Sequence, residues 1–376
     1  AMAMATGFAD LSPAVIAQLP SSSFSSLYNS GFSARFGAII ACQDTNEIFR
    51  LPPGSAVLEK VEISYSVDAQ DSELIAVHVW DDGDQTHLAT IICAGTVDDS
   101  AVVSHLSIFQ FNALSPTPSR SVHKSVYYVP FLMDGFRDKT SGNYHIILTS
   151  DQGLHVYKCS PDSITEIDSD GRRDPSRLQT LLDSNRSQQY VMSMDRLFTA
   201  DVGVLAIGGR DGSVSLSVVG TPTPRVESCC TLDGPIPSLN LIQIDNAISL
   251  VVVAAAGSAY LFTDVVQRKL TASSMSIFPG SESSDCLTSS SVVRDQRLVL
   301  IGSWVNEVLV YYLAPFPAPP VLLSRLQLSN QIYRLHWGPI INDRDDLIVF
   351  TMRSIYVFPK SHLLDHVDHC RQNRKI

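Results

Sequence analysis

The stretch Gly203–Val219, with the sequence GVLAIGGRDGSVSLSVV, decides the fold of this chain. Val204–Ile207 form a short apolar run, Gly208–Gly212 form a polar turn, and within Val214–Val218 apolar residues alternate with serines. A continuous apolar run predicts a strand buried on both faces, and alternation predicts a half-exposed strand. The stretch therefore predicts a β-hairpin whose first strand is the more deeply buried.

The same hairpin pattern recurs along the chain, with successive turns about 46 to 60 residues apart, which is the period of four-stranded propeller blades. Long amphipathic segments that would form helices between the hairpins are almost absent, so a layered α/β fold is disfavoured. The seven predicted hairpins span Phe36–Leu51, His87–Phe111, Tyr144–Cys159, Gly203–Val219, Ile248–Val265, Arg297–Leu313 and Asp346–Phe358.

Further strand candidates lie between the hairpins, so each blade is expected to contain an inner strand, the hairpin and an outer strand. Seven such blades use about 330 residues, which nearly exhausts the chain and favours one closed ring. These additional candidates are Val57–Tyr65, Leu74–Trp80, Ser125–Val129, Leu239–Ile244, Val321–Leu328 and Ile332–Trp337.

The predicted fold class is all-β, a single seven-bladed β-propeller closed by an N-terminal strand and followed by a short C-terminal α-helix. We expect the propeller in residues 20–360, the helix in residues 361–376 and an N-terminal extension in residues 1–19. The last hairpin ends at Phe358-Pro359 without a later strand. Ser23–Tyr28 is therefore predicted to supply the missing outer strand, because closure removes exposed sheet edges.

Three segments fall outside the repeat. Pro161–Ser187 is polar and is predicted to be a long loop. Ala314–Pro320, APFPAPP, is predicted to be a stiff polyproline-like connector between strands or, alternatively, a proline-motif ligand. Ser361–Arg374 is predicted to be an amphipathic helix with Ser361 as its N-cap and basic residues near its C-terminus.

Composition disfavours several classes of function. The net charge of −11 gives no concentrated basic face, so nucleic-acid binding and adsorption to an anionic membrane are not expected. The seven cysteines lack CxxC spacing and fit free thiols in a reducing compartment. The uncharged stretch Asn246–Thr263 is interrupted by Gly257 and Ser258, so we expect a buried hairpin rather than a membrane span. With a poor N-terminal signal peptide, these features predict a soluble, cytoplasmic protein without direct membrane insertion.

Candidate chemistry is sparse. His362, His366 and His369 share one face of the predicted helix beside Cys370, but the metalloprotease glutamate is absent, so a solvated face competes with a metal site. The acidic runs 81–84 and 342–346 lack a complete calcium pattern. No GxSxG motif and no activated cysteine occur. We therefore predict no catalytic residue, no metal and no cofactor, and a protein that is not an enzyme.

Several features resemble the kaptin family of β-propeller proteins. They include the run Asp233–Ile236, the hairpin end Tyr260–Asp264, the turn Phe278–Ser281 and the run Ile355–Phe358 before a basic-ended helix. Matching segments upstream are Phe24–Ser26, Ala38–Cys42 and Leu154–Lys158, whereas the segment 161–187 and the tail differ from the family.

This resemblance implies a subunit of the KICSTOR complex, which brings the GATOR-type Rag GTPase-activating complex to the lysosomal surface so that TOR kinase signalling falls when nutrients are scarce. It also implies an integrin-like FG-GAP propeller subunit and a large scaffold subunit as partners, and peripheral association with lysosomes through them. Actin is a further implied partner. An actin-filament-associated cytoskeletal propeller is therefore the alternative function, and a propeller hydrolase or lyase with a site over the central channel is the third.

A rigid propeller binds partners through a few aromatic or aliphatic anchors. The predicted anchors lie beside the proline connector and on the terminal helix, although the helix residues could instead pack on their own propeller. These candidates are Phe316, Leu322, Leu323, Leu363, Leu364 and Val367.

Overall fold

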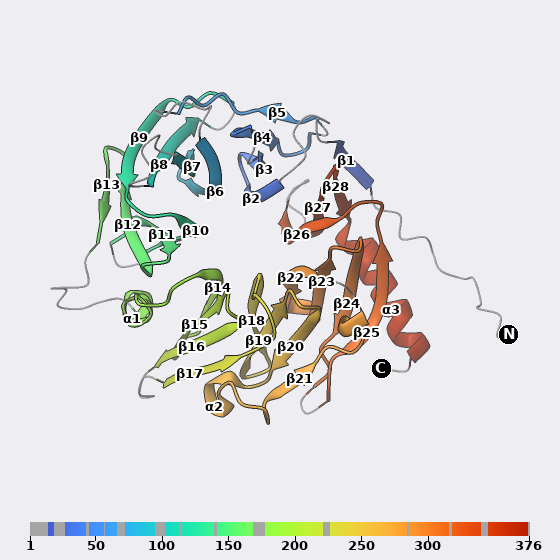
Figure 1. Cartoon of the computed structure of the whole chain (residues 1–376). Helices are drawn as coiled ribbons and strands as arrows, with labels where there is room; N and C mark the ends of the chain where they lie inside the picture. The colour runs from blue at the N-terminus through green and yellow to red at the C-terminus, as the bar shows by residue number, and fades with distance from the viewer. Residues whose placement is uncertain are drawn as a thin grey trace.

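The computed structural model describes residues 14–18, 27–42, 45–55, 57–65, 72–94, 102–112, 115–138, 141–167, 177–220, 226–283, 286–315, 318–339 and 345–374. Within them the strands form seven four-stranded antiparallel sheets, arranged radially as the blades of one ring (Figure 1). This confirms the predicted seven-bladed β-propeller.

Each of the first six blades runs from an inner strand outward in chain order. Blade 1 contains β2 (Leu27–Ser33), β3 (Gly37–Cys42), β4 (Glu47–Leu51) and β5 (Glu59–Lys60), and blade 2 contains β6 (Ser72–Asp82), β7 (Gln85–Ala94), β8 (Val103–Asn112) and β9 (Arg120–Val126). Blade 3 contains β10 (Pro130–Arg137), β11 (Tyr144–Ser150), β12 (Leu154–Ser160) and β13 (Ser163–Glu166), and blade 4 contains β14 (Val191–Phe198), β15 (Val202–Gly209), β16 (Ser213–Gly220) and β17 (Val226–Thr231).

The remaining blades follow the same order except at the closure. Blade 5 contains β18 (Ser238–Ile244), β19 (Ala247–Ala254), β20 (Ser258–Phe262) and β21 (Met275–Ile277), and blade 6 contains β22 (Leu287–Val293), β23 (Leu298–Ser303), β24 (Glu307–Tyr312) and β25 (Val321–Gln327). Blade 7 contains β26 (Ile332–Pro339), β27 (Asp345–Thr351), β28 (Ser354–Phe358) and, as its outer strand, β1 (Ala14–Gln18).

The stretch that predicted the fold forms β15 and β16 of blade 4. All residues of Val204–Ile207 are buried, as the continuous apolar run required. Gly212 closes the turn with φ +85°, a conformation that L side chains rarely adopt. A Cβ at this position would lie 2.1 Å from the Leu232 carbonyl oxygen, so the tight approach of the next connection also requires glycine.

The apolar core is divided among the contacts between neighbouring blades. Among the described residues, seven buried clusters each join two adjacent blades, and one of them joins the first blade to the last through Ala38, Ile40, Ile348 and Ile355. Because apolar burial stabilises every blade through both neighbours, the ring is one cooperative unit rather than a row of separate domains.

The closing strand differs from the prediction. β1 (Ala14–Gln18) pairs with β28 in antiparallel register, so an N-terminal strand does close the ring, but it is not Ser23–Tyr28. Leu27 and Tyr28 belong instead to β2, which pairs with β3, and residues 23–26 lie outside the described residues. The prediction failed because the closing strand must be joined to β2, the inner strand of blade 1, by a connecting segment. Ser23–Tyr28 leaves no room for such a segment, since its last residues already belong to β2.

The connections also differ in places. Pro161–Ser187, predicted as one long loop, contains β13 and the helix α1 (Arg177–Ser184), whose Leu181 and Leu182 are fully buried. Val57–Tyr65 contributes only the two residues of β5, and β9 ends at Val126 rather than spanning Ser125–Val129. Three further short elements lie within the described residues: α2 (Val265–Arg268), η2 (Ser281–Ser283) and η3 (Arg294–Gln296).

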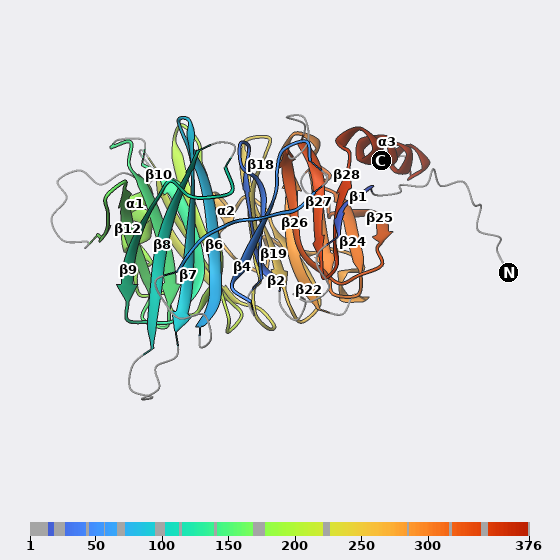
Figure 2. The same cartoon turned by 90° about the horizontal axis from the view of Figure 1, so that it is seen from above.

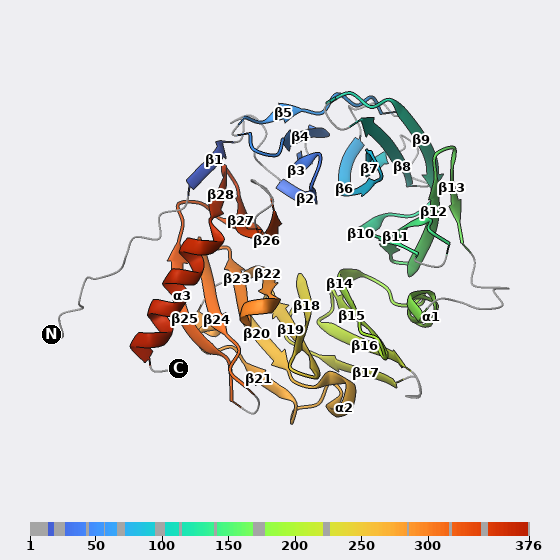
Figure 3. The same ribbon diagram turned by 180° about the vertical axis from the view of Figure 1, so that it is seen from behind.

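The predicted terminal helix is confirmed as α3 (Lys360–Arg374). It lies along one side of the ring, next to β25 and β28, as the view from behind shows (Figure 3). The helix begins one residue earlier than expected, and Ser361 is not its N-cap. The first amide, of Lys360, donates instead to Asp346 Oδ1 at 2.8 Å, so a carboxylate of blade 7 satisfies the helix start.

Candidate functional site

The terminal helix packs on blades 6 and 7. Leu363 is 0% exposed and Val367 is 3% exposed, and both belong to the buried cluster that joins these blades. Leu364 is half-buried against the same cluster. The apolar face of α3 is thus covered by the chain's own propeller. The sequence analysis gave this packing as the alternative to partner binding by Leu363, Leu364 and Val367.

The structure brings the two predicted groups of anchors together. Leu323 on β25 is 3% exposed and lies in the same cluster as Leu363, whereas Leu322 packs half-buried against the cluster between blades 5 and 6. Phe316 lies outside the described residues. A partner could reach the buried anchors only after α3 leaves its groove, so their role in partner binding remains a prediction.

Polar contacts hold α3 at both ends. Lys360 Nζ lies 3.3 Å from Asp295 Oδ2, and the Arg371 guanidinium lies 4.4 Å from the centre of the Tyr312 ring. The Arg374 guanidinium donates to the Leu322 carbonyl oxygen. These contacts fix the helix in register on β25 and blade 7, because cation–π and charge-assisted contacts are directional.

The histidines of α3 do not form a metal site. His362 and His369 are exposed, and His369 Nε2 lies 3.0 Å from Asn373 Nδ2. His366 Nε2 lies 3.7 Å from Cys370 Sγ, and partial burial lowers the pKa of His366 while it raises the pKa of Cys370. Within the part of the chain that the structure describes, no three such side chains are placed to hold a metal ion.

The carboxylates of the acidic run 81–84 form hydrogen bonds and ion pairs within the propeller. Asp81 Oδ1 accepts hydrogen bonds from Ser33 Oγ and Thr86 Oγ1, both at 2.7 Å. The neighbouring carboxylates of this run, Asp82 and Asp84, pair with arginines. The run, which lies in blade 2, therefore contacts both neighbouring blades, blade 1 and blade 3. In the second run, residues 342–344 lie outside the described residues.

A Ser–His–Glu arrangement occurs in blade 3. His155 Nε2 lies 3.1 Å from Ser150 Oγ, and His155 Nδ1 lies 3.0 Å from Glu166 Oε1, which is the hydrogen-bond order of a hydrolase triad. Ser150 is 0% exposed, however, and its hydroxyl also accepts the Gln152 amide at 2.9 Å. A substrate carbonyl cannot reach this oxygen, so the arrangement is a structural brace of the β11–β12 turn.

A cavity of about 150 Å³ opens between blades 2 and 3. Trp80 forms one wall and stacks on Tyr144, with ring centres 4.1 Å apart and planes 1° apart. The nearby carboxylate of Asp82 is already paired with Arg137 at 3.0 Å. Arg120, which also lines the cavity, pairs with Asp162.

The exposed large apolar side chains gather on one face of the ring. We call it the hairpin face, because it carries the turns between the second and third strands of the blades. β28 runs away from its turn, so α3 lies on the opposite face, as the edge-on view shows (Figure 2). The exposed apolar residues of the hairpin face are Val102, Tyr127, Phe131, Tyr190, Met192, Trp304 and Val305.

Sequence reasoning missed this surface. It treated the turn at Val305 only as a marker of the hairpin, although an aromatic residue and a valine in a turn already suggest exposure. Aromatic residues and methionine are enriched in protein–protein interfaces. The hairpin face is therefore the strongest candidate interaction surface in the described chain.

The fold and surface define the class: the chain is a seven-bladed β-propeller protein. Solved structures share this fold at low identity, so the likeness concerns the fold alone. A chain in a crystal structure of the mitotic checkpoint complex has a TM-score of 0.62 at 10% identity, covering 96% of this chain and 98% of that one. Saccharomyces cerevisiae Sqt1 has a TM-score of 0.54 at 10% identity, with 93% and 100% covered. BBS1N in complex with ARL6DN has a TM-score of 0.51 at 14% identity, with 87% and 88% covered.

The family comparison is more specific. Residues 242–370 match the family model described as KICSTOR complex protein kaptin. This segment runs from β18 through blades 6 and 7 into α3, which is about a third of the chain. The match confirms the resemblance to the kaptin family and supports a kaptin assignment, and with it a propeller adaptor. No curated protein matches the chain.

Proposed function

We propose that this chain is a non-enzymatic β-propeller adaptor and a kaptin-like subunit of the KICSTOR complex. The family match over residues 242–370 carries the proposal, because its description names that complex. In this role the chain helps to recruit the GATOR-type Rag GTPase-activating complex to lysosomes and supports inhibition of TOR kinase signalling when nutrients are scarce.

The proposed direct partners are an integrin-like FG-GAP propeller subunit and a large scaffold subunit. A rigid ring suits this role, since it holds binding residues of several blades in fixed positions without a large ordering cost on association. Among the described residues no helix is long and apolar enough to cross a membrane. The proposed lysosomal location therefore depends on these partners.

Reconstitution and a cellular readout test the proposal together. The chain is co-expressed with the two proposed partners, and complex formation is measured by size-exclusion chromatography. In cells that lack the chain, recruitment of the GATOR-type complex to lysosomes and phosphorylation of TOR substrates are followed after nutrient withdrawal. We expect a stable complex, lost recruitment and persistent phosphorylation. The role would be refuted if the chain bound neither partner. It would also be refuted if cells that lack the chain still lost phosphorylation of TOR substrates after nutrient withdrawal.

Co-sedimentation with actin filaments distinguishes the adaptor role from the alternative function, an actin-filament-associated cytoskeletal propeller. Binding to filaments by the purified chain, without binding to the KICSTOR-type subunits, would favour a cytoskeletal propeller.

A further inference from the structure

One turn of the ring carries the sequence pattern that proline-directed protein kinases accept. Thr117-Pro118-Ser119-Arg120 follows β8 and leads into β9 of blade 2, with a proline directly after the threonine and an arginine three positions after it. These kinases accept proline at the first position because proline has no backbone N–H that the kinase groove would leave unsatisfied. A basic residue at the third position pairs with an anionic group of the kinase.

This combination singles out Thr117 among the hydroxyl residues of the chain. Thr117, Ser119 and Arg120 are all exposed, so a kinase can reach both the hydroxyl and the arginine. Arg120 pairs with Asp162 at the surface, and an exposed ion pair of this kind is easily exchanged for another. The other hydroxyl residues that precede a proline lack a basic residue three positions later; they are Ser12, Ser115, Ser160, Thr221 and Thr223.

The turn is held by polar contacts rather than by apolar packing. The Ser119 amide donates to Gln110 O at 2.8 Å, and the Thr117 amide donates to Ser115 Oγ at 3.2 Å. None of the described residues 115–119 belongs to a buried apolar cluster. A surface turn of this kind can be drawn into a kinase active site while the blades stay folded.

The turn contacts a segment that comes from the neighbouring blade. We call residues 61–65 the strap, because they follow β5 of blade 1 and lie against blade 2. The Glu62 amide donates to Pro116 O at 3.0 Å, and the Thr117 hydroxyl donates to Glu62 Oε2 at 3.1 Å. The threonine hydroxyl is thus one of the groups that hold the strap on blade 2.

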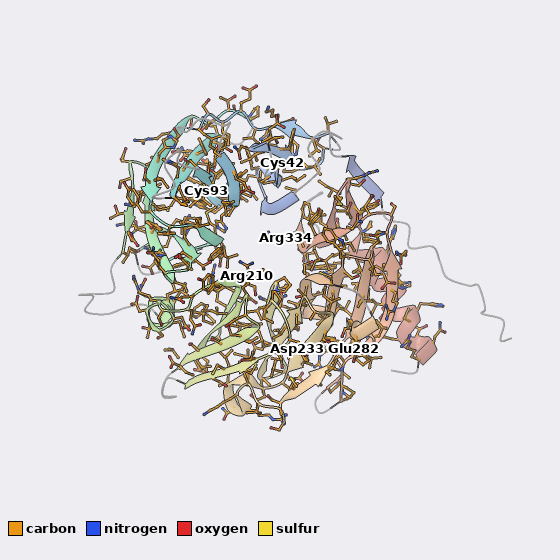
Figure 4. The ribbon with its side chains drawn as sticks, viewed as in Figure 1. Cys42, Cys93, Arg210, Asp233, Glu282 and Arg334 are labelled. Carbon is orange, nitrogen blue, oxygen red and sulfur yellow. The ribbon has the colours of Figure 1, made fainter. Side chains whose placement is uncertain are left out.

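The strap covers an apolar contact between blades 1 and 2. Cys42 and Cys93 mark these two blades, which lie side by side in the ring (Figure 4). Val61 is buried, and Ile63 and Tyr65 pack half-buried on the cluster between the blades. The intervening residues of the strap are exposed. The strap therefore separates part of this cluster from solvent.

We propose that Thr117 is a phosphorylation site of a proline-directed kinase and that its phosphate releases the strap. The kinase transfers the γ-phosphoryl group of ATP. A bond forms between the phosphorus and Thr117 Oγ1, the bond from the phosphorus to the β,γ-bridging oxygen breaks, and ADP leaves. The hydroxyl proton passes to the catalytic aspartate of the kinase. The new group carries a charge of about −1.5 to −2 and no longer donates the hydroxyl hydrogen bond to Glu62.

The charges around the new phosphate favour release. The Glu62 carboxylate lies at hydrogen-bond distance from the modified oxygen, so two negative groups repel each other there. Lys60 is already paired with Glu47 at 2.6 Å. Arg120 reaches Asp162 of blade 3, on the side of blade 2 away from blade 1. A phosphate that pairs with Arg120 is therefore also drawn away from Glu62.

Release of the strap makes Ile63 and Tyr65 accessible at the contact between blades 1 and 2. Phosphorylation at one turn thus changes the surface of the ring while the seven blades keep their own strand pairing. This inference goes beyond the proposed adaptor role, because it assigns a modification site and its structural effect whichever complex the chain joins.

Incubation of the purified full chain with ATP and a cyclin-dependent kinase bound to its cyclin tests the assignment. We expect phosphate at Thr117, located by mass spectrometry of peptides. Thr117→Ala should abolish this signal and Thr117→Ser should retain it. Arg120→Gln should lower kcat/KM about tenfold or more, the value of a hydrogen bond between charged groups. The matched control is Ser160→Ala, which changes a hydroxyl before a proline without the arginine and should leave incorporation unchanged.

Amide hydrogen exchange of the phosphorylated chain tests the release. The amides of the strap should exchange about tenfold faster after phosphorylation, whereas those of β19 in blade 5 should keep their rates. Glu62→Gln keeps an acceptor for the Thr117 hydroxyl but removes the negative charge, so phosphorylation should accelerate exchange much less in this variant. Thr117→Val removes the hydrogen bond without adding charge and should also have a smaller effect than the phosphate.

Each part of the inference has an outcome that would overturn it. The assignment would be wrong if the folded chain took up no phosphate, if only the heat-unfolded chain were modified, or if Thr117→Ala left incorporation unchanged. Release would be wrong if phosphate at Thr117 left exchange in the strap unchanged or slowed it. Equal acceleration in the Glu62→Gln chain would overturn the electrostatic cause. Thermal melting verifies that all variants fold.

Discussion

Leu363→Ala is expected to release the terminal helix while the ring stays folded. Leu363 is 0% exposed and lies in the cluster between blades 6 and 7. Replacing a buried leucine by alanine costs about 2 to 5 kcal/mol, because the lost methyl groups leave a cavity. The remaining contacts of α3 are the buried Val367 and Cys370, the half-buried Leu364 and a few polar groups at its ends. They are too few to compensate for this loss, whereas the blades retain their own cores.

Amide hydrogen exchange measures this opening directly. A loss of 2 kcal/mol raises the open population of α3 about thirtyfold, so its amides should exchange at least about thirtyfold faster. The amides of β15 and β19, which lie in blades distant from α3, should keep their wild-type rates. The matched control is His362→Ala, an exposed change on the same helix that should alter stability by less than about 0.5 kcal/mol.

Two outcomes would refute this reasoning. Unchanged exchange in α3 would mean that Leu363 does not anchor the helix. Equally accelerated exchange in all blades would mean that α3 is part of the cooperative ring rather than a separable cover over Leu323.

Three further predictions concern the ring itself. Ser150→Ala should lower the free energy of unfolding, measured by chemical denaturation, by about 1 to 2 kcal/mol, since it removes a buried hydrogen bond. A fluorophosphonate probe should not label Ser150 in the folded chain, and labelling would contradict its structural role. Burial lowers the pKa of His336 to about 4, so the unfolded chain binds the proton first as the pH falls below 6.5. Stability should therefore fall by about 3 kcal/mol between pH 6.5 and 4, and His336→Gln should flatten that part of the profile; an equally steep profile would exclude His336 as its source. Gly212→Ala should lower stability by about 1 to 3 kcal/mol because of its left-handed φ and the nearby Leu232 carbonyl, whereas unchanged melting would show that the turn can rearrange.

Much of the architecture could be predicted because it is encoded locally. A buried strand such as Val204–Ile207 needs a continuous apolar run, and a tight turn needs a residue such as Gly212. These requirements act within about twenty residues, roughly the length of one hairpin, so each of the seven hairpins could be found separately. The helix at α3 was found in the same way, from apolar residues at helical spacing.

The closure was harder to predict because it joins the two ends of the chain. β1 is one of several short segments before residue 36 that could have paired with β28, and the local pattern does not distinguish them. Only the position of β2 beside β3 decides which segment remains available. The same limit applies to α1, whose buried Leu181 and Leu182 were hidden in a polar stretch.

The sequence by itself determined the blade number, the hairpins and the likeness to kaptin, because these depend on periodicity and order along the chain. Only the tertiary structure decided which apolar residues are exposed. Leu363 and Val367 are covered by the chain's own blades, whereas Phe131 and Met192 are turned outward by bulges. The physical reason is that the exposure of a side chain depends on the register between strands and on the packing between blades. A register shift of one residue turns a side chain to the other face of the sheet, although the sequence of the strand is unchanged.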